Sequence, residues 1–531
     1  MHYKFLDGKN KSYKKITYAI KYNAEMRQIT LYDGNQYTVY NSITDLANAL
    51  EYKSTSYRKV VWCYGLSEMI AYIGEKYFDL VEKHSTKSSI VKYALMFGGD
   101  IIFKNLKEFY FSSKSLDKIK ELNCIDKNIT DEVVITWLCA NKEFKFCNEK
   151  VSSIPYSQIG YIRRKLRDRI HHTDFKLLNQ SRTKELDEVF AKCKNGSLSG
   201  INEQYINETK YVYCYDFKSF YPWIMCTQQF PNCHYYLEHN LPINDFFRKC
   251  NKYKRWIATI TFDYIYPKNK SNCRDWFNFA NETSNTITIT NLDMSIIHNT
   301  YDYKIKSINE FVGFYKMELL PIDVRQFIIE QYMIKETCEK NTDKYNDAKV
   351  AVNCVFGIFD TNPLKYNQDN NNPSAKKFPY VIGIFTAAYG RYFLWEIMKD
   401  HNPIHWDTDG FKTMDHIDLT EYNLRRKIPD IMLGQLICEN ELAELTVFGN
   451  KQYLLNDTLK LAGTSGEKAM VYFKNVLKRK PKAGDTIPPE YTSTGIWDKT
   501  NGGGYKNLSF TIGSKFKNII GDEINNEEIF I

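Results

Sequence analysis

The chain has 531 residues, of which 43% are hydrophobic and 25% are charged, a composition typical of globular proteins. This length predicts several domains with a large buried core, and the composition excludes a disordered chain. The formal net charge of +9 is compatible with a polyanionic partner but is too small to establish one. The 13 cysteines form no C-x-x-C pair, the N-terminus has no signal-peptide pattern, and no apolar run approaches a membrane span. We therefore expect a reduced, cytoplasmic protein with no membrane contact.

The first 170 residues predict a mixed α/β region. Short β-type runs occur at 28–32, 37–40 and 100–104, and a helical pattern covers 66–82. The region ends in a run of basic residues at 163–169. Such a run indicates either a solvated helix face or a contact with a phosphate backbone.

A strand that ends on an acid follows a polar junction at residues 183–209. Residues 211–217 are β-branched and aromatic and include Asp216 near their end, while Pro222 can open a helix just after them. A carboxylate at the end of a strand is well placed to be exposed in a site. The alternative is that this acid is only a helix N-cap.

Two helices are predicted at about 323–338 and 344–357, joined by a polar turn. On the second, Lys349, Asn353 and Phe356 are spaced i, i+4 and i+7, so they share one face. A cation, an amide and a ring on one stripe suit a triphosphate with stacking beside a base. The alternative is a solvated face with one aromatic anchor.

An apolar helix at 378–395 leads into residues 404–411, where Asp407 and Asp409 stand two apart and are closed by Gly410. If this is a β-hairpin, we expect the two carboxylates to point the same way. Like charges this close repel unless a cation lies beside them, and paired acids suit Mg²⁺. A solvated turn is the alternative, because Asp, Thr and Gly are ordinary turn residues.

The last part of the chain is basic. Paired strands are predicted at 451–455 and 459–463, and five lysines or arginines fall within 474–482. Because Tyr472 and Phe473 precede this basic run, we favour a nucleic-acid contact over a solvated face.

In this order, the motifs resemble those of family B DNA polymerases, and most closely the protein-primed branch of bacteriophages and linear plasmids. Residues 216–222 resemble motif A, residues 349–357 motif B, residues 406–410 motif C, and residues 451–453 the K-x-Y element. Residues 290–301 are also similar to family sequence between motifs A and B. The resemblance is specific from about 211 to 463 and weaker outside.

The resemblance implies a DNA-templated DNA polymerase that adds dNMPs to a 3′-hydroxyl by two-metal catalysis. The catalytic residues it implies are Asp216, Asp407 and Asp409. Two Mg²⁺ ions, for which Mn²⁺ can substitute, would be held by Asp216, Phe217 and Asp409. The nucleotide-binding residues would be Tyr221, Lys349, Asn353 and Phe356, with Tyr221 excluding a 2′-hydroxyl. The primer and template would contact Lys451, Tyr453, Thr408 and Arg391.

The sequence departs from the family pattern at four positions. Gly410 and Cys354 stand where serine is usual, Phe356 where tyrosine is usual, and Phe220 where leucine is usual. None of these removes a metal ligand or the triphosphate lysine.

The fold implied is a multidomain, mixed α+β protein. It combines an RNase H-like, exonuclease-type N-terminal domain with a polymerase of palm, fingers and thumb. The expected domains are the exonuclease-like domain at 1–180, palm at 181–240, an insertion at 241–320, fingers at 321–357, palm with a short insertion at 358–463, and thumb at 464–531.

The proofreading motifs look degenerate. No D-x-E occurs in the first 180 residues, Tyr64 stands where the N-x-x-x-D motif has its Asn, and the Y-x-x-x-D motif reads Tyr161 to Lys165. Lysine cannot ligate Mg²⁺. Lys104 replaces an acid in the primer-end element. We expect no 3′–5′ exonuclease activity, and a scaffold whose basic residues contact nucleic acid.

The partners implied are primer–template DNA, dNTPs and a terminal priming protein, in replication of a viral or plasmid genome in the host cytoplasm. A nucleic-acid primer is the alternative to the protein. A rival from another class is a catalytically silent nucleic-acid-binding homologue that kept the shell. The presence of Asp216 and Asp409 favours the enzyme.

Overall fold

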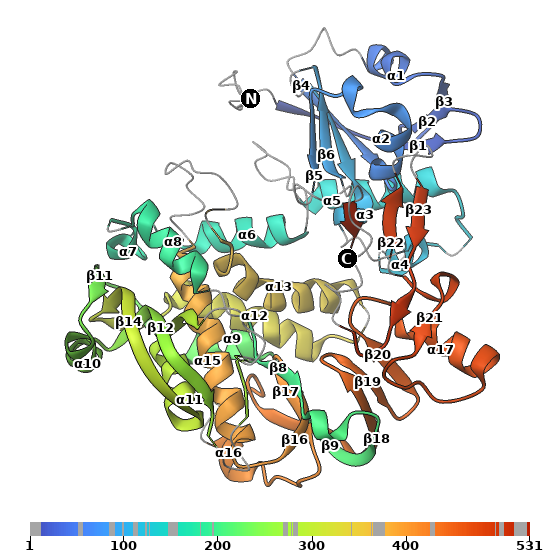
Figure 1. Cartoon of the computed structure of the whole chain (residues 1–531). Helices are drawn as coiled ribbons and strands as arrows, with labels where there is room; N and C mark the ends of the chain where they lie inside the picture. Colours follow the sequence, from blue (N-terminus) through green and yellow to red (C-terminus); the bar gives the residue numbers. More distant parts are fainter. Residues whose placement is uncertain are drawn as a thin grey trace.

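The computed structural model describes residues 12–50, 57–83, 91–97, 100–109, 115–122, 125–126, 128–146, 158–171, 173–180, 182–193, 196–268, 274–277, 279, 285–340, 342–362, 364, 378–424, 431–493, 495–498, 504–514 and 528–530. Three sheets organise most of these residues: an N-terminal sheet, a central sheet and an insertion sheet. Figure 1 shows the N-terminal sheet in blue, apart from the helices and strands around the central sheet.

The N-terminal sheet has the strand order β3-β2-β1-β4-β7-β6-β5, in which β4 pairs in parallel with β1 and β7. Its strands are β1 (Ser12–Asn23), β2 (Gln28–Tyr32), β3 (Tyr37–Tyr40), β4 (Tyr57–Cys63), β5 (Leu80–Lys83), β6 (Val91–Met96) and β7 (Ile101–Asn105). Side chains of β4 alternate between two cores: Val61 packs with α1 (Ile43–Ala49) and α2 (Leu66–Ile73), and Val60 with α4 (Leu116–Leu122) and α5 (Glu132–Phe146). The helical pattern predicted at 66–82 is therefore wrong beyond Ile73, because β5 begins at Leu80.

The next helix does not belong to this sheet. Helix α6 (Gln158–Arg169) packs against α12 (Ile322–Thr337) and α13 (Asp343–Phe359), and its buried Leu166 joins the core of the central sheet. We expected the first domain to run to residue 180. The packing instead places α6 with the central body, because its apolar face is buried there.

The basic run on α6 is partly occupied by these contacts. Arg163 donates to the Thr361 hydroxyl at 2.8 Å, and Arg169 forms an ion pair with Glu330 at 2.8 Å. At these two positions the charges hold α6 to its neighbours instead of facing solvent alone.

The central sheet carries the predicted acids. Its order is β20-β19-β18-β9-β17-β16-β8, so strands from distant parts of the chain are neighbours. The strands are β8 (Ser199–Ile201), β9 (Thr209–Phe217), β16 (Pro403–Asp407), β17 (Gly410–Thr413), β18 (Leu436–Gly449), β19 (Gln452–Leu455) and β20 (Thr458–Leu461). The short helix α9 (Phe220–Thr227) follows β9 directly, and the long helix α15 (Tyr380–Met398) precedes β16.

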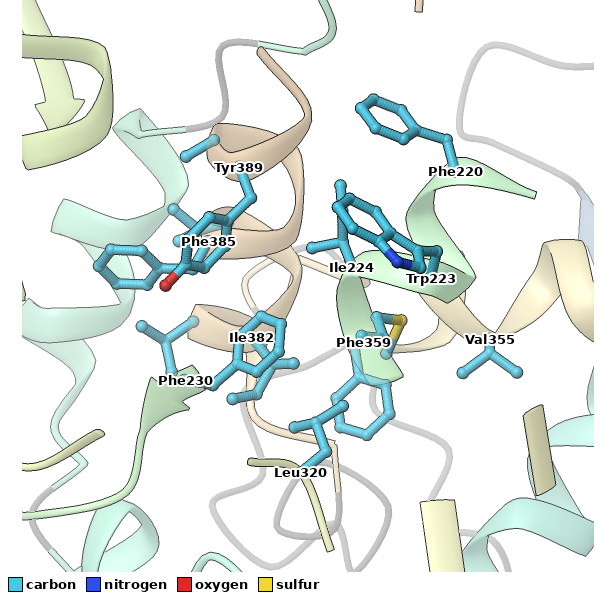
Figure 2. Packing of buried hydrophobic residues seen from close by; sticks show 14 of the residues in the cluster. Phe220, Trp223, Ile224, Phe230, Leu320, Val355, Phe359, Ile382, Phe385 and Tyr389 are labelled. Carbon is cyan, nitrogen blue, oxygen red and sulfur yellow. The ribbon is translucent and has the colours of Figure 1, made fainter. Parts of the chain in front are cut away.

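Helices α9, α13 and α15 pack together through aromatic side chains. Figure 2 shows Phe220, Trp223 and Ile224 of α9 with Val355 and Phe359 of α13, and Ile382, Phe385 and Tyr389 of α15. The rings of Phe217 and Phe220 stack with centroids 4.1 Å apart. This core fixes the start of α9 against the end of β9, where Asp216 lies.

The segment between motifs A and B forms the insertion sheet, in the order β11-β14-β12-β13. Its elements are β11 (Tyr235–Leu241), α10 (Ile243–Lys252), β12 (Arg255–Pro267), β13 (Thr286–Thr290), α11 (Asn291–Thr300) and β14 (Tyr301–Phe314). It has its own aromatic core around Phe246, Trp256 and Phe311. A small two-stranded ladder of β10 (Gln229–Pro231) and β15 (Met317–Leu319) joins it to the central body.

Helices α12 and α13 match the pair predicted from the sequence and contact each other along their length. The short insertion expected after Gly357 falls mostly outside the described residues. The chain then ends in α17 (Gly466–Tyr472), a π-helical turn (Phe473–Leu477), β21 (Thr486–Ile487), β22 (Gly495–Asp498), β23 (Gly504–Asn507), β24 (Phe510–Thr511) and β25 (Glu528–Phe530). Within the described residues, every helix is too short or too polar to traverse a lipid bilayer.

One glycine is needed where a loop crosses α9. Gly434 has φ +77°, and its N–H donates to the Lys218 carbonyl at 2.7 Å. A Cβ at this position would lie 2.0 Å from the Trp223 ring. The loop can therefore approach α9 this closely only without a side chain.

Gly434→Ala should destabilise the protein by at least about 2 kcal/mol more than Gly484→Ala, because overpacking adds to backbone strain. Gly484 is the matched control, since it also has positive φ (+92°) but has no atom within 4 Å of a built Cβ. Urea unfolding followed by tryptophan fluorescence measures both. Equal losses would show that the Trp223 overlap relaxes freely.

Candidate active site

Three acids from two distant segments meet at one end of the central sheet. Gly410 on β17 pairs with Asp216 on β9 and with Asp407 on β16, so the twin-acid turn lies beside the end of β9. The Phe217 N–H donates to the Asp409 carbonyl at 2.9 Å. A hairpin between β16 and β17 was predicted from the sequence, and it is confirmed.

The close approach of these strands explains one departure from the family pattern. A Cβ at Gly410 would lie 2.7 Å from the Asp216 Oδ1 and 2.7 Å from the Tyr215 carbonyl oxygen. A serine side chain would collide with the carboxylate beside it. Glycine at position 410 therefore allows Asp216 to lie this close to the turn.

Burial and mutual repulsion raise the pKa values of two of the acids. Burial is the main cause for Asp216, whose pKa rises to about 7, and the neighbouring charge of Asp409 adds to it. Burial likewise raises the pKa of Asp409 to about 6, with the charge of Asp407 second. Glu439 on β18 raises both pKa values further, and no sequence pattern had pointed to this acid. The group thus holds more negative charge than it can stabilise by itself.

Asp407 has a different setting from the other two. It forms an ion pair with Lys451 at 2.9 Å and accepts a hydrogen bond from the Thr408 hydroxyl at 2.9 Å. Alternation along a strand led us to expect Asp407 and Asp409 to point the same way. In the structure Asp407 is the last residue of β16, whereas Thr408 and Asp409 form the turn between β16 and β17.

Backbone strain gathers at this site. Ser219, Thr408 and Lys451 have φ of +50°, +56° and +58°, a region that residues other than glycine rarely adopt. For a β-branched residue such as Thr408 this conformation is a clear outlier, with a cost on the order of 1–3 kcal/mol. Surrounding contacts must therefore hold these three residues in place.

The donor set suits a hard divalent cation. In the described part of the chain, no three His, Cys, Asp or Glu side chains form a group that could hold a metal by themselves. Mg²⁺, however, is usually bound through one or two carboxylates plus substrate phosphates and water. Asp216 and Asp409 supply such a pair, and their raised pKa values indicate that a cation would relieve their repulsion.

A row of lysines lies next to the acids. Lys335 on α12 donates to the Ser219 hydroxyl at 3.3 Å, and burial lowers its pKa, with the charges of Lys218 and Lys349 adding to the effect. The charge of Lys335 also opposes the rise in the pKa of Asp216, so this lysine acts on the acids as well. Lys349 and Asn353 are exposed on α13, as the helical spacing predicted.

Two rings close one side of the site. Tyr221 stacks on Phe356, with ring centroids 4.3 Å apart, and a Cβ at Gly390 would lie 2.7 Å from the Tyr221 ring. A cavity of about 240 Å³ opens beside them, lined also by Ser197 and Thr408. Two predicted nucleotide-binding residues, Tyr221 and Phe356, are therefore brought together although they are 135 positions apart in the sequence.

Tyr453 lies behind the turn in a cluster that sequence reasoning missed. Its ring is 4.5 Å from the Lys412 ammonium and 4.7 Å from the His405 ring. Burial lowers the pKa of Lys412, and it lowers that of His405 well below 6.5, so the imidazole is neutral. The alternation of β16 and β17 could have placed Lys412 on the face of the acids, but no motif drew attention to it.

Arg391 does not lie on the surface where a primer–template contact was expected. It is only 2% exposed and forms a two-pronged ion pair with the fully buried Asp293, at 2.7 and 3.0 Å. Its remaining nitrogen donates to the Gly196 carbonyl. The guanidinium is thus committed to protein partners, although it reaches the wall of the cavity.

One segment that the sequence assigned to the proofreading motifs lies elsewhere in the structure. Tyr161 to Lys165 lie on α6, against α12 and α13, so they are not on the N-terminal sheet. Two other acids, Glu68 on α2 and Glu132 on α5, lie near each other, and the pKa of Glu132 is raised chiefly by burial, with the charge of Glu68 adding to it. Each has a lysine nearby: Lys107 is 3.7 Å from Glu68, and the charge of Lys21 acts on Glu132.

The lysine at the expected primer-end element is not available to nucleic acid. Lys104 on β7 is 2% exposed, and its ammonium lies 5.0 Å from the Trp62 ring. Both faces of β7 are covered, so Lys104 is not among the basic residues of this region that could contact nucleic acid.

The raised pKa values predict how stability depends on pH without metal. Between about pH 4 and 7 the folded protein keeps protons on Asp216 and Asp409 that the unfolded chain has released, so these groups make unfolding easier as pH rises. Asp216→Asn should raise the Tm of metal-free protein at pH 8 by roughly 2–5 °C and change it little at pH 5.

Asp457→Asn is the matched control, since Asp457 is an exposed acid in the turn between β19 and β20. Differential scanning calorimetry at both pH values makes the comparison. Destabilisation by Asp216→Asn at pH 8 would contradict the electrostatic account.

Comparison with known proteins supports the architecture. No protein-family model matches the sequence, and no curated protein does. Among solved structures, phi29 DNA polymerase complexed with primer-template DNA matches with TM-score 0.67 and 15% identity, over 94% of this chain and 100% of that one. The same polymerase with primer-template DNA and incoming nucleotide substrates gives TM-score 0.67 and 16% identity, with the same coverage. The chain therefore has the fold of a DNA polymerase, and the predicted mixed α+β, multidomain architecture is confirmed.

Proposed function

We propose that the chain is a DNA-templated DNA polymerase that adds deoxynucleotides to a 3′-hydroxyl. The observation that carries the proposal is the meeting of Asp216 and Asp409 beside the lysine row of Lys335 and Lys349. Adjacent negative and positive sites of this kind suit a metal-bound triphosphate. The phi29 enzyme that shares the fold has been observed with primer-template DNA and incoming nucleotides.

Asp216 and Asp409, with the Phe217 carbonyl, would hold two Mg²⁺ ions, for which Mn²⁺ could substitute. When bound, such ions lower the pKa of a 3′-hydroxyl and neutralise the leaving pyrophosphate. Asp407 supports the pair from its contacts with Lys451 and Thr408. Lys335 and Lys349 bring positive charge to the phosphates, and Asn353 shares the same helix face.

The aromatic pair would select the sugar. Tyr221 is held against Phe356 and Gly390, so its ring has little room to move aside for a 2′-hydroxyl. Lys451 and Tyr453 would hold the end of the primer next to Asp407, with Thr408 in the turn. The phenylalanine in place of the family's tyrosine at 356 keeps the stacking surface.

The setting we propose is replication of a viral or plasmid genome in the host cytoplasm, with a terminal protein able to serve as primer. The insertion sheet supports this, because it has an aromatic core of its own and is of a size able to receive a partner. Primer–template DNA and dNTPs are the other partners.

We further propose that proofreading is absent. The acids Glu68 and Glu132 on the N-terminal sheet stand near Lys107 and Lys21. An ammonium neutralises a carboxylate but cannot polarise water or bind a phosphate oxygen as Mg²⁺ does. The fold would persist here as a scaffold without hydrolytic chemistry.

Primer extension on a labelled primer–template with dNTPs and Mg²⁺ tests the polymerase proposal. Wild-type protein should extend the primer, and Asp409→Asn should slow extension on the order of 10³-fold, equivalent to about 4 kcal/mol of transition-state stabilisation. Asp457→Asn should be unaffected. DNA binding with no extension would contradict the proposal and favour the silent homologue.

Incubation of a labelled single strand with Mg²⁺ and no nucleotides tests the loss of proofreading. The strand should keep its length for hours. Stepwise 3′ shortening that co-purifies with the protein and disappears in Glu132→Gln would overturn this part of the proposal. Asp409→Asn serves as the control, since it leaves the N-terminal sheet unchanged.

A further inference from the structure

The most buried ion pair among the described residues joins the insertion sheet to helix α15. Arg391 is 2% exposed and Asp293 is 0% exposed. Asp293 also accepts hydrogen bonds from the N–H and the hydroxyl of Thr290, at 3.0 and 2.8 Å, and so caps α11 at its start. All of the carboxylate's partners therefore come from inside the protein.

This ion pair is connected to the catalytic turn through a short loop. The third contact of the Arg391 guanidinium is the Gly196 carbonyl. The next residue, Ser197, shares a hydrogen bond of 2.9 Å with the Thr408 hydroxyl, and the Leu198 carbonyl accepts from the Thr408 N–H at 2.9 Å. Ser197 therefore contacts the side chain of Thr408, and Leu198 contacts its backbone.

The loop has little freedom to lie elsewhere. It continues into β8, where Ser199 and Gly200 pair with Asp407 and Trp406 of β16. A Cβ at Gly200 would lie 2.6 Å from the Trp406 ring, so the chain that follows the loop lies in direct contact with β16. Its position thus depends on β16 at one end and on Arg391 at the other.

Thr408 in turn sets the acids on either side of it. Its hydroxyl donates to the Asp407 Oδ1 at 2.9 Å, and its φ of +56° turns the chain toward Asp409. A β-branched residue keeps this conformation only when its surroundings fix it. The contacts from Ser197 and Leu198 are the ones that do so on the side away from the acids.

A buried ion pair contributes little net stability, because desolvation offsets most of its attraction. It does hold its partners in one arrangement, since a displaced charge would be left unpaired in the core. Arg391 is thus suited to fix the Gly196 carbonyl, and with it the loop, at a defined place beside the turn.

We propose that Arg391, Asp293 and Ser197 are positioning residues for Asp407 and Asp409, and that they do not contact DNA. The path runs from Asp293 through Arg391 to the 196–198 loop, then to Thr408 and the acids. It ties the geometry of the metal-binding pair to the first turn of α11 in the insertion sheet. The inference rests on the proposed function, because it assumes that these acids bind divalent ions.

The test uses full-length protein with a primer–template and the variants Ser197→Ala, Arg391→Met and Arg391→Lys. Three quantities are measured: binding of Mn²⁺ without nucleotides from the electron paramagnetic resonance signal of the free ion, the Mg²⁺ concentration that half-saturates extension, and the Kd for primer–template by mobility shift. Ser307→Ala and Arg182→Met are matched controls, because Ser307 donates a hydroxyl bond and Arg182 forms an ion pair with Asp187 away from the site.

Ser197→Ala and Arg391→Met should weaken Mn²⁺ binding and raise the half-saturating Mg²⁺ about 10-fold, as loss of a group supporting metal ligands does. The Kd for DNA should stay within about twofold of wild type, and the controls should match wild type. Arg391→Lys should recover part of the metal affinity, since it keeps the charge but loses the two-pronged geometry.

Weaker DNA binding with unchanged metal affinity in Arg391→Met would overturn the inference and restore a direct DNA contact. Unchanged metal affinity in Ser197→Ala, which removes one hydroxyl and preserves the core, would overturn it as well. If wild-type protein binds Mn²⁺ through Asp216 and Asp409 but extends no primer, the proposed function fails while the Mn²⁺ titrations still decide the positioning role.

Discussion

The structure depends on holding Asp216 and Asp409 close together in spite of their repulsion. Neither acid is near the other in sequence, and both have pKa values raised by burial and by the neighbouring charge. The pairing of β17 with β9 keeps them adjacent, because the ladder of hydrogen bonds between these strands extends from Tyr213 to Asp216. The unfavourable energy of this arrangement is offset by the large apolar core beside it, in which Phe217 is buried together with Phe220 and Trp223. Figure 2 shows Phe220 and Trp223 in this core.

The same principle explains why strained backbone and buried charge are found at this end of the sheet. Thr408 and Lys451 both have positive φ, and each contacts Asp407 through its side chain. The buried ion pair of Arg391 and Asp293 reaches this end of the sheet through the Gly196 carbonyl. Strained backbone and a buried ion pair would each destabilise an ordinary core. Here they restrict the acids to a single arrangement, and a metal site requires such a fixed arrangement.

Much of this site could be predicted from the sequence, because several of its residues belong to short local patterns. The i, i+4, i+7 spacing placed Lys349 and Asn353 on one exposed face of α13, and the apolar runs around Asp407 and Asp409 gave the hairpin. Residues that act through distant contacts could not be found this way. Nothing near Lys412 or Glu439 in the sequence shows that β17 and β18 flank Asp216. The partner of Arg391 is 98 positions away, so its burial was hidden as well.

In the N-terminal region, short sequence patterns suggested site residues that the packing does not support. There, a short pattern at Tyr161 to Lys165 suggested a motif, but the packing of α6 on α12 and α13 removes it from the N-terminal sheet. Lys104 stands where the motif has an acid, and it is buried because both faces of β7 are covered. A motif of two or three residues carries meaning only with the element on which it lies, and that element is decided by contacts far along the chain.

The central claim is that divalent ions bind between Asp216 and Asp409. Its most direct test is a crystal structure of the protein with primer–template, a non-hydrolysable dNTP and Mn²⁺, with the metal located by anomalous scattering. The account predicts anomalous peaks within about 2.5 Å of carboxylate oxygens of both residues. Peaks bound to only one of these acids, or none at this end of the sheet while the nucleotide is in place, would contradict it.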